Sequence, residues 1–311
     1  MLTILGVTGP IFILIAVGFA AVRGGALVQS EIRALGVFVI NFALPALLFK
    51  AMAQRSPGQL LDVDLLVVYA AGSLAVVAGV LAVTCLIGKR SLQDGTVLAM
   101  GMSVSNSAFI GFPIAQQLIG AKASASLALY AVVETLIMLP LLMTLAELGG
   151  KSGRHWVLVL GGIAGRLLKN PMFVAILAGV AFAAFAIQLP LPLARAVDML
   201  SGASAPVALF YIGCILAGLS LKGMAGDIGS IVAGKLILHP LAIFCVFLLL
   251  PFDDSGLRNA AIINAGMPMM SIYPILGQRY GKEGVCAAAL VATTVTSFFT
   301  ISFLLWLTGV G

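Results

Sequence analysis

The side chains best suited to chemistry lie in two polar interruptions of long apolar runs. The first is residues 103–120, which carry Asn106, Gly111 and Pro113 inside a stretch long enough to cross a bilayer. Proline removes a backbone donor and clashes with the preceding turn, so this helix is predicted to break. A broken helix is tolerated in hydrocarbon only where protein buries it or where it lines a wet cavity. At such a break Asn106 could donate to an anion, accept from a proton carrier or bond a neighbouring helix. We therefore take Asn106 and Pro113 as candidate binding residues.

The second interruption lies near the other end of the chain and has the same character. Pro268 and Pro274 are six residues apart, so helical hydrogen bonding is predicted to fail between them. Asn264, just before this break, forms a second pair of candidate binding residues with Pro268. Tyr273 either supplies a hydroxyl group to the site or packs as a buried aromatic ring.

Two further polar residues are candidates for the wall of the same cavity. Asn41 lies four residues before Pro45, a proline that predicts a kink in its helix. Ser103 either lines the cavity or hydrogen-bonds back to the preceding turn of its own helix.

Ionisable residues inside apolar runs are costly and so are functional candidates. Glu134 lies near the middle of such a run and is either a proton-coupling group or a protonated structural glutamate. His239 could relay protons, or it could be a hydrogen-bonded core histidine. Lys235, one helical turn before His239, is expected to extend its ammonium group to the membrane surface.

Residues for other chemistries are sparse. Asp253 and Asp254 are adjacent but have no second acidic motif, which is typical of a solvated turn rather than a metal site. The four isolated cysteines are interpreted as small buried apolar residues. We expect no catalytic group, no metal and no cofactor.

Composition indicates an integral membrane protein. Apolar residues make up 61% of the 311 residues and charged residues only 9%, whereas charged residues are about a quarter of a soluble domain. The net charge of +6 is carried mostly by the predicted loops, without interleaved aromatic residues, so a nucleic-acid partner is not expected.

The apolar runs predict an all-helical fold with ten membrane spans. Three pairs of residues are each 161 positions apart: Gly95 and Gly256, Pro45 and Pro206, and Pro113 and Pro274. This register predicts two five-span repeats, and an odd number of spans per repeat makes the second repeat inverted. The predicted spans are 3–22, 34–50, 63–87, 95–119, 124–147, 171–189, 199–221, 228–250, 257–278 and 284–308.

The basic residues predict how the chain is oriented. Most of the 17 lysines and arginines follow odd-numbered spans, so those loops are predicted to be cytoplasmic and both termini external. We expect a multi-pass protein of the plasma (inner) membrane. It divides into a first repeat at 1–150, a cytoplasmic interfacial linker at 151–170 and a second repeat at 171–311. The five external basic residues are Lys50, Arg55, Lys122, Arg195 and Arg258.

The sequence resembles the auxin efflux carrier family, which includes the plant PIN auxin exporters and bacterial carriers of malonate and other organic acids. The likeness covers essentially the whole chain. It is carried by NFALP at 41–45, NSAFIGFPI at 106–114 with Gly120, Met-Pro at 267–268 and Arg-Tyr-Gly at 279–281.

This resemblance implies two inverted five-helix repeats whose fourth and ninth helices are broken and cross, as in bile-acid symporters and sodium/proton antiporters. The family's crossover asparagine and proline fall on Asn106 and Pro113, and the proline of the ninth helix falls on Pro268. Met269 and Met270 stand where the plant proteins have more polar residues, which favours a ligand other than auxin. A homodimer is implied by the family alone.

These observations predict a secondary transporter that moves a small organic anion, of the malonate or auxin kind, by alternating access at the crossover. The positive ends of the half-helix dipoles would face the carboxylate. Protons or the membrane potential would drive the transport. Two alternatives remain: a sodium-coupled organic-anion symporter, which the lack of paired acidic residues near Pro268 disfavours, and a membrane-embedded lipid-modifying enzyme.

Overall fold

The computed structural model describes residues 2–54, 62–120, 122–150, 170–218, 225–250 and 252–307. Helices make up the regular structure of these residues, and an isolated antiparallel bridge joins Ser105 to Met269. The predicted linker 151–170 lies outside the described residues except for Asn170.

The helices of the first half of the chain are α1 (Leu2–Arg23), α2 (Gln29–Phe38), η1 (Val39–Ala43), α3 (Leu44–Ala53), α4 (Val63–Leu81), η3 (Ala82–Ile87), α5 (Leu92–Ser103), η4 (Ser107–Gly111), α6 (Phe112–Ile119), α7 (Lys122–Val132), η5 (Val133–Met138) and α8 (Leu139–Leu148). Those of the second half are α10 (Pro171–Ala184), α11 (Leu191–Gly218), α12 (Ala225–Ala233), η6 (Gly234–Leu238), α13 (His239–Leu249), α14 (Ser255–Ala265), α15 (Tyr273–Gln278) and α16 (Glu283–Leu307).

Six continuous helical stretches among the described residues are long and apolar enough to cross a membrane. Three shorter apolar helices accompany them. The all-helical membrane fold is thereby confirmed, whereas the count of ten spans stays a prediction. The long stretches are Glu31–Ala53, Val63–Ile87, Lys122–Leu148, Leu191–Gly218, Gly226–Leu249 and Glu283–Leu307; the short ones are Gly9–Arg23, Ser107–Ile119 and Pro171–Ala184.

Four of the spans widen into a π-helical turn immediately before a proline. Each of the turns η1, η4, η5 and η6 is followed by an α-helix whose second residue is proline. These prolines are Pro45, Pro113, Pro140 and Pro240. A proline cannot donate to the carbonyl four residues back, and its ring clashes with that carbonyl. The residue before each proline instead donates to the carbonyl five residues back, as Leu139 does to Glu134. The sequence therefore sets where the helices loosen, and such turns often occur at functional sites.

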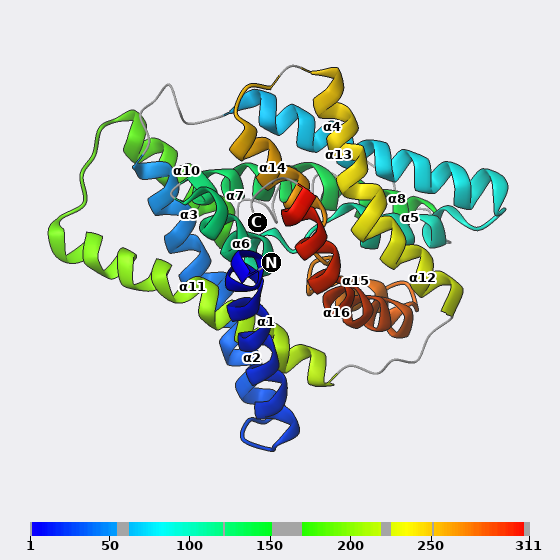
Figure 1. Cartoon of the computed structure of the whole chain (residues 1–311), viewed down its shortest axis with the longest axis horizontal. Coiled ribbons are helices and arrows are strands. Elements are labelled where there is room, and N and C mark those ends of the chain that lie inside the picture. Colours follow the sequence, from blue (N-terminus) through cyan, green and yellow to red (C-terminus); the bar gives the residue numbers. More distant parts are fainter. Residues whose placement is uncertain are drawn as a thin grey trace.

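The helices form two groups that are visible in Figure 1. Helices α1, α3, α10 and α11 pack together, while α4, α5, α7, α8, α12, α13 and α16 form the second group around the broken segments. Glycines allow α1 and α11 to approach closely, because a Cβ at Gly18 would overlap the backbone of Phe210 and one at Gly213 would overlap Ile15.

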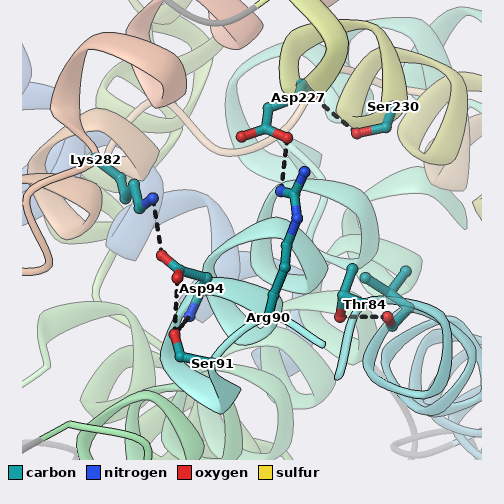
Figure 2. A network of polar contacts seen from close by, with 8 residues as sticks. Thr84, Arg90, Ser91, Asp94, Asp227, Ser230 and Lys282 are labelled. Carbon is teal, nitrogen blue, oxygen red and sulfur yellow. Dashed lines mark hydrogen bonds and ion pairs between the residues drawn. The ribbon is translucent and has the colours of Figure 1, made fainter. Parts of the chain in front are cut away.

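Ion pairs tie the ends of the broken helices together. Lys282, after α15, contacts Asp94 in the first turn of α5 at 2.8 Å (Figure 2). Lys122, at the start of α7, contacts Asp254, which caps α14, at 2.6 Å. Each broken segment is thus held at its start by a lysine that follows the other broken segment.

Candidate functional site at the helix crossover

The two polar interruptions predicted from the sequence meet in space. The first break separates α5 from η4, where Val104 is extended, so it precedes Asn106 and does not lie at Pro113 as predicted. At Pro113 the helix Ser107–Ile119 continues, and the proline only opens the π-helical turn η4. The second break separates α14 from α15. The two backbones pair antiparallel through Ser105 and Met269. The backbone N–H of Asn106 donates to the carbonyl oxygen of Pro268 at 2.8 Å. The interrupted helices therefore cross at their breaks, and a backbone donor freed by one break is satisfied by the other.

Asn106 has a buried donor that nothing in the described chain satisfies. The residue is 3% exposed, and its Oδ1 accepts from the backbone N–H of Phe109 at 3.3 Å, which caps η4. Its Nδ2 is buried without a hydrogen-bond partner among the described residues. Leaving a buried donor unpaired costs about 1–3 kcal/mol. A group that accepts from this amide would recover that free energy.

Asn264 joins the two halves of the crossover through its side chain. Its Nδ2 donates to the hydroxyl of Tyr69 at 2.9 Å and to Oγ of Ser107 at 2.8 Å. Its Oδ1 lies directly against Gly111, where a Cβ would overlap it. Only glycine leaves room for the amide at this position.

Glu134 lies in η5 with its carboxylate turned toward the crossover. Its Oε1 accepts from Ser107 Oγ at 2.5 Å and from the hydroxyl of Tyr69 at 3.2 Å, and the residue is 8% exposed. Tyr69 is also 3.2 Å from Oγ of Ser105. Because a phenol carries one proton, Tyr69 donates to either Glu134 or Ser105 at a given moment.

Lys235 is fully buried, so the expectation that it extends to the membrane surface is wrong. Its Nζ lies 2.7 Å from Ser105 Oγ, from the carbonyl oxygen of Ala265 and from Nδ1 of His239. These three acceptors match the three hydrogens of an ammonium group. The lysine stays inside because the break at the end of α14 supplies an acceptor that hydrocarbon would otherwise leave unpaired.

His239 extends the hydrogen-bonded chain to α4. Its Nε2 is 2.9 Å from Oγ of Ser73, and the ring is fully buried. An ammonium at Lys235 makes Nδ1 the acceptor, which leaves the ring proton on Nε2 for Ser73. The hydrogen-bonded residues that connect Glu134 to His239, named here the crossover network, are Tyr69, Ser73, Ser105, Ser107, Glu134, Lys235, His239 and Asn264.

The remaining predicted residues are placed as follows. Ser103 donates back to the carbonyl of Ala99 at 2.8 Å, which is the local alternative of its two interpretations. Tyr273 is fully buried and donates to the carbonyl of Val97 at 3.0 Å. Pro113 is buried in the first turn of α6. Asn41 is exposed and donates to the carbonyl of Val37 at 3.0 Å, so its amide is not part of the network.

A polar cavity of about 560 Å³ lies between the two helix groups. Its walls come from α3 and α11 on one side and from α6 and α7 on the other. Lys50 and Asp198 form an ion pair of 2.7 Å at this cavity, and Gln116 faces it from the helix that continues the first broken segment. We call this space the vestibule. The described residues hold no cluster of three potential metal-ligating side chains of the His, Cys, Asp or Glu types.

Sequence reasoning missed the central place of Lys235 and the contribution of Tyr69 and Ser73. One signal was present in the chain. Glu134 precedes Pro140 by six residues and Lys235 precedes Pro240 by five, so each stands in the turn that its proline forces open. Tyr69 and Ser73, within the regular helix α4, carry no comparable signal.

The helical membrane fold and the crossed breaks define a membrane transport protein, and comparison with known proteins identifies the family. Residues 4–305 match the family model described as membrane transport protein. The chain belongs to this family, the auxin efflux carriers, as its sequence motifs predicted.

Individual relatives cover almost the same length. A proposed malonate transporter of Rhizobium meliloti (strain 1021) is 30% identical over 99% of this chain and 96% of its own. An uncharacterized transporter of Methanothermobacter thermautotrophicus is 23% identical over 95% of both chains. The uncharacterized transporter YfdV of Escherichia coli (strain K12) is 23% identical over 96% of this chain and 95% of its own. The family and these names indicate a transporter rather than an enzyme.

Proposed function

We propose that this protein is a secondary active transporter of a small organic anion, of the malonate class, which binds where the two broken helices cross. The single observation that carries the proposal is the buried amide of Asn106, whose Nδ2 has no partner among the described residues although it stands at the crossover. Burying an unpaired donor is a cost that a bound carboxylate oxygen would remove. The 30% identity to a proposed malonate transporter supports the substrate class.

The finer architecture that we propose is ten spans in two inverted repeats. The two ion pairs at the ends of the broken helices support it. Asp94 and Asp254 are 160 positions apart, as are Lys122 and Lys282, and each lysine contacts the aspartate of the other repeat. A reciprocal contact of this kind is what two-fold related units produce. The short segments α5, α6, α14 and α15 are then halves of two interrupted spans.

The substrate would be held by polar groups at the start of η4. Asn106 would donate its free Nδ2 to one carboxylate oxygen, and the positive end of the dipole of η4 and α6 would favour the negative charge. Pro113 and Pro268 would keep the two segments from continuing as regular helices. Asn264, already engaged with Tyr69 and Ser107, would position the crossover rather than contact the substrate first.

Protons or the membrane potential are the proposed driving force, with Glu134 and His239 as the proton-coupling groups. Both belong to the crossover network, so a change of protonation at either one alters the hydrogen bonds around the break. Lys235 supports this choice over sodium. Its Nζ occupies the position beside the free carbonyl of Ala265 where a bound cation would find oxygen ligands.

The vestibule is the proposed entry path. It lies between the two helix groups, and its polar wall includes Lys50, Lys122 and Gln116. Under the predicted orientation Lys50 and Lys122 are external, so the vestibule would open to the outside of the plasma membrane. Movement of one helix group against the other would then expose the crossover to the opposite side.

Transport by reconstituted protein tests the proposal. Proteoliposomes that carry the wild-type protein should exchange radiolabelled malonate, with a rate that depends on pH and not on sodium. Asn106→Ala should lower the rate at least about tenfold, the loss expected when one hydrogen bond to a charged group is removed. Ser302→Ala on α16, remote from the crossover, is the control and should transport normally. Normal exchange by Asn106→Ala, with equal protein in the membrane, would refute the site.

A further inference from the structure

A groove of about 1020 Å³ lies between η6, α13, α14 and α16, separate from the vestibule. Its walls are strongly apolar, with Leu241, Phe299 and Phe303 more than half exposed along them. The yellow, orange and red helices that form it are neighbours in Figure 1. Exposed side chains of this kind on a membrane protein face hydrocarbon, so the groove is open to lipid rather than to water.

One end of the groove carries a cation that has no side-chain partner among the described residues. Arg258 lies in the first turn of α14, is half-buried, and lines the groove. Its guanidinium has no ion pair or hydrogen bond with any described residue. The nearby carboxylate of Asp254 is already engaged with Lys122 and with the backbone N–H of Leu257. A half-buried guanidinium presents five donors in a planar fork that matches a phosphate group.

The ends of the helices place this cation at a membrane interface. On α16 the groove extends from Phe299 to Leu307, about 12 Å along the helix, and Leu307 is the last residue of α16 that the structure describes. Trp306, 62% exposed beside this end, is the amphipathic residue typical of the headgroup level. Arg258 therefore lies where a lipid headgroup would lie, with the apolar walls below it.

We infer that this groove binds an anionic phospholipid, with the phosphate on Arg258 and an acyl chain along Phe244, Phe299 and Phe303. The charge selects the headgroup, because an anionic lipid neutralises a guanidinium that pairs with no carboxylate in the described part of the chain. A second copy of the chain fits less well. A two-fold contact centred on the groove would bring two unpaired Arg258 side chains together, which like-charge repulsion disfavours.

A lipid in the groove would also stabilise α14, the helix that carries Asn264 of the crossover network. Ile262 lines the groove on α14, and Asn264 of the crossover network follows two residues later on the same helix. A chain that fills the groove steadies α14, so anionic lipid is expected to raise the unfolding temperature as well as to bind.

Native mass spectrometry of the purified protein tests the inference, with phosphatidylglycerol and phosphatidylcholine as the probes. The wild type should retain one phosphatidylglycerol with about tenfold preference over phosphatidylcholine, the effect of one charge-assisted contact. Arg258→Gln should lose that preference, and Arg258→Lys should keep a part of it. Arg195→Gln is the matched control, because Arg195 is an exposed arginine on α11 outside the groove.

A second variant tests the acyl-chain part of the site. Thr300→Trp adds a bulky side chain to the groove wall and should lower retention of both lipids while the protein stays folded by circular dichroism. Unchanged phosphatidylglycerol retention in Arg258→Gln or in Thr300→Trp would overturn the inference. So would an equal loss of preference in Arg195→Gln, or disulfide crosslinking of two copies through Phe299→Cys.

Discussion

At the scale of single residues, the buried lysine is the feature that most distinguishes this crossover. The ammonium of Lys235 donates to the carbonyl of Ala265 at the second break and to the hydroxyl of Ser105 at the first. It also contacts the ring of His239 on its own helix. The ammonium therefore supplies donors to buried acceptors of both breaks, which hydrocarbon could not supply.

Replacing that lysine measures how much the crossover depends on it. Lys235→Met should destabilise the protein by about 3 kcal/mol or more, because it leaves the carbonyl of Ala265 and its other partners buried without a donor. Lys50→Met is the control for stability. Its ion pair with Asp198 is partly exposed, at 34% and 53%, and should contribute about 0–1 kcal/mol. Denaturant unfolding in detergent distinguishes the two, and equal losses would contradict the central position of Lys235.

The contact between Gly111 and Asn264 gives a second prediction at this scale. Gly111→Ala should displace the amide of Asn264 from Tyr69 and Ser107, lower the melting temperature and reduce transport, since the added Cβ overlaps Oδ1. Gly79→Ala in α4 adds a methyl group to open space and should be neutral or stabilising by about 0.4–1 kcal/mol. Wild-type melting and transport in Gly111→Ala would show that the amide is not held in this place.

At the scale of elements, the sequence predicted that both segments break, but it attributed the first break to Pro113, whereas the chain is extended before Asn106. Asn106, Pro113, Asn264 and Pro268 could be singled out because prolines and amides inside apolar runs have local physical consequences. The pairing of Ser105 with Met269 could not, because it depends on how α5 and α14 cross. For the same reason the sequence alone predicts a surface position for Lys235: two of its three acceptors, on Ala265 and Ser105, lie 30 and 130 residues away in the chain.

The ion pairs between broken segments predict a dependence of stability on pH. Hydrogen bonding to Lys282 lowers the pKa of Asp94, and hydrogen bonding to Lys122 lowers the pKa of Asp254. Each folded-state pKa thus lies below its unfolded value, near 4. The ion pairs therefore stabilise the fold fully above the unfolded-state pKa of the two aspartates. This stabilisation is lost as pH falls through their folded-state pKa.

Melting temperatures between pH 6 and pH 3 check this. The wild type should lose stability in the acidic part of the range, and Asp94→Asn combined with Asp254→Asn should lose less over the same interval. An identical decline in both proteins would mean that other carboxyl groups govern acid unfolding. Exchanging the charges, Asp94→Lys with Lys282→Asp, should restore part of what Asp94→Lys alone removes.

At the scale of the whole molecule, two helix groups enclose a polar vestibule beside the crossover. Such an arrangement suits alternating access, because the cavity lies where one group can move against the other. The proposed orientation follows from the loop charges alone and can be tested by itself.

Thiol labelling in a background without the four native cysteines tests that orientation. Ser124→Cys, in the vestibule wall, should react with a membrane-impermeant reagent added to intact cells. Ser91→Cys, which caps α5 at the opposite face, should react only after the membrane is permeabilised. The reverse pattern would invert the orientation while leaving the fold unchanged.

The most direct test of the account is whether a carboxylate stabilises the purified protein through Asn106. The melting temperature would be measured with increasing malonate for the wild type and for Asn106→Ala. Ligand at 100 times its Kd stabilises a protein by about 2.7 kcal/mol, so the wild type should show a clear rise that saturates. We predict no rise in Asn106→Ala. An equal rise in both proteins would contradict the claim that the crossover asparagine holds the substrate.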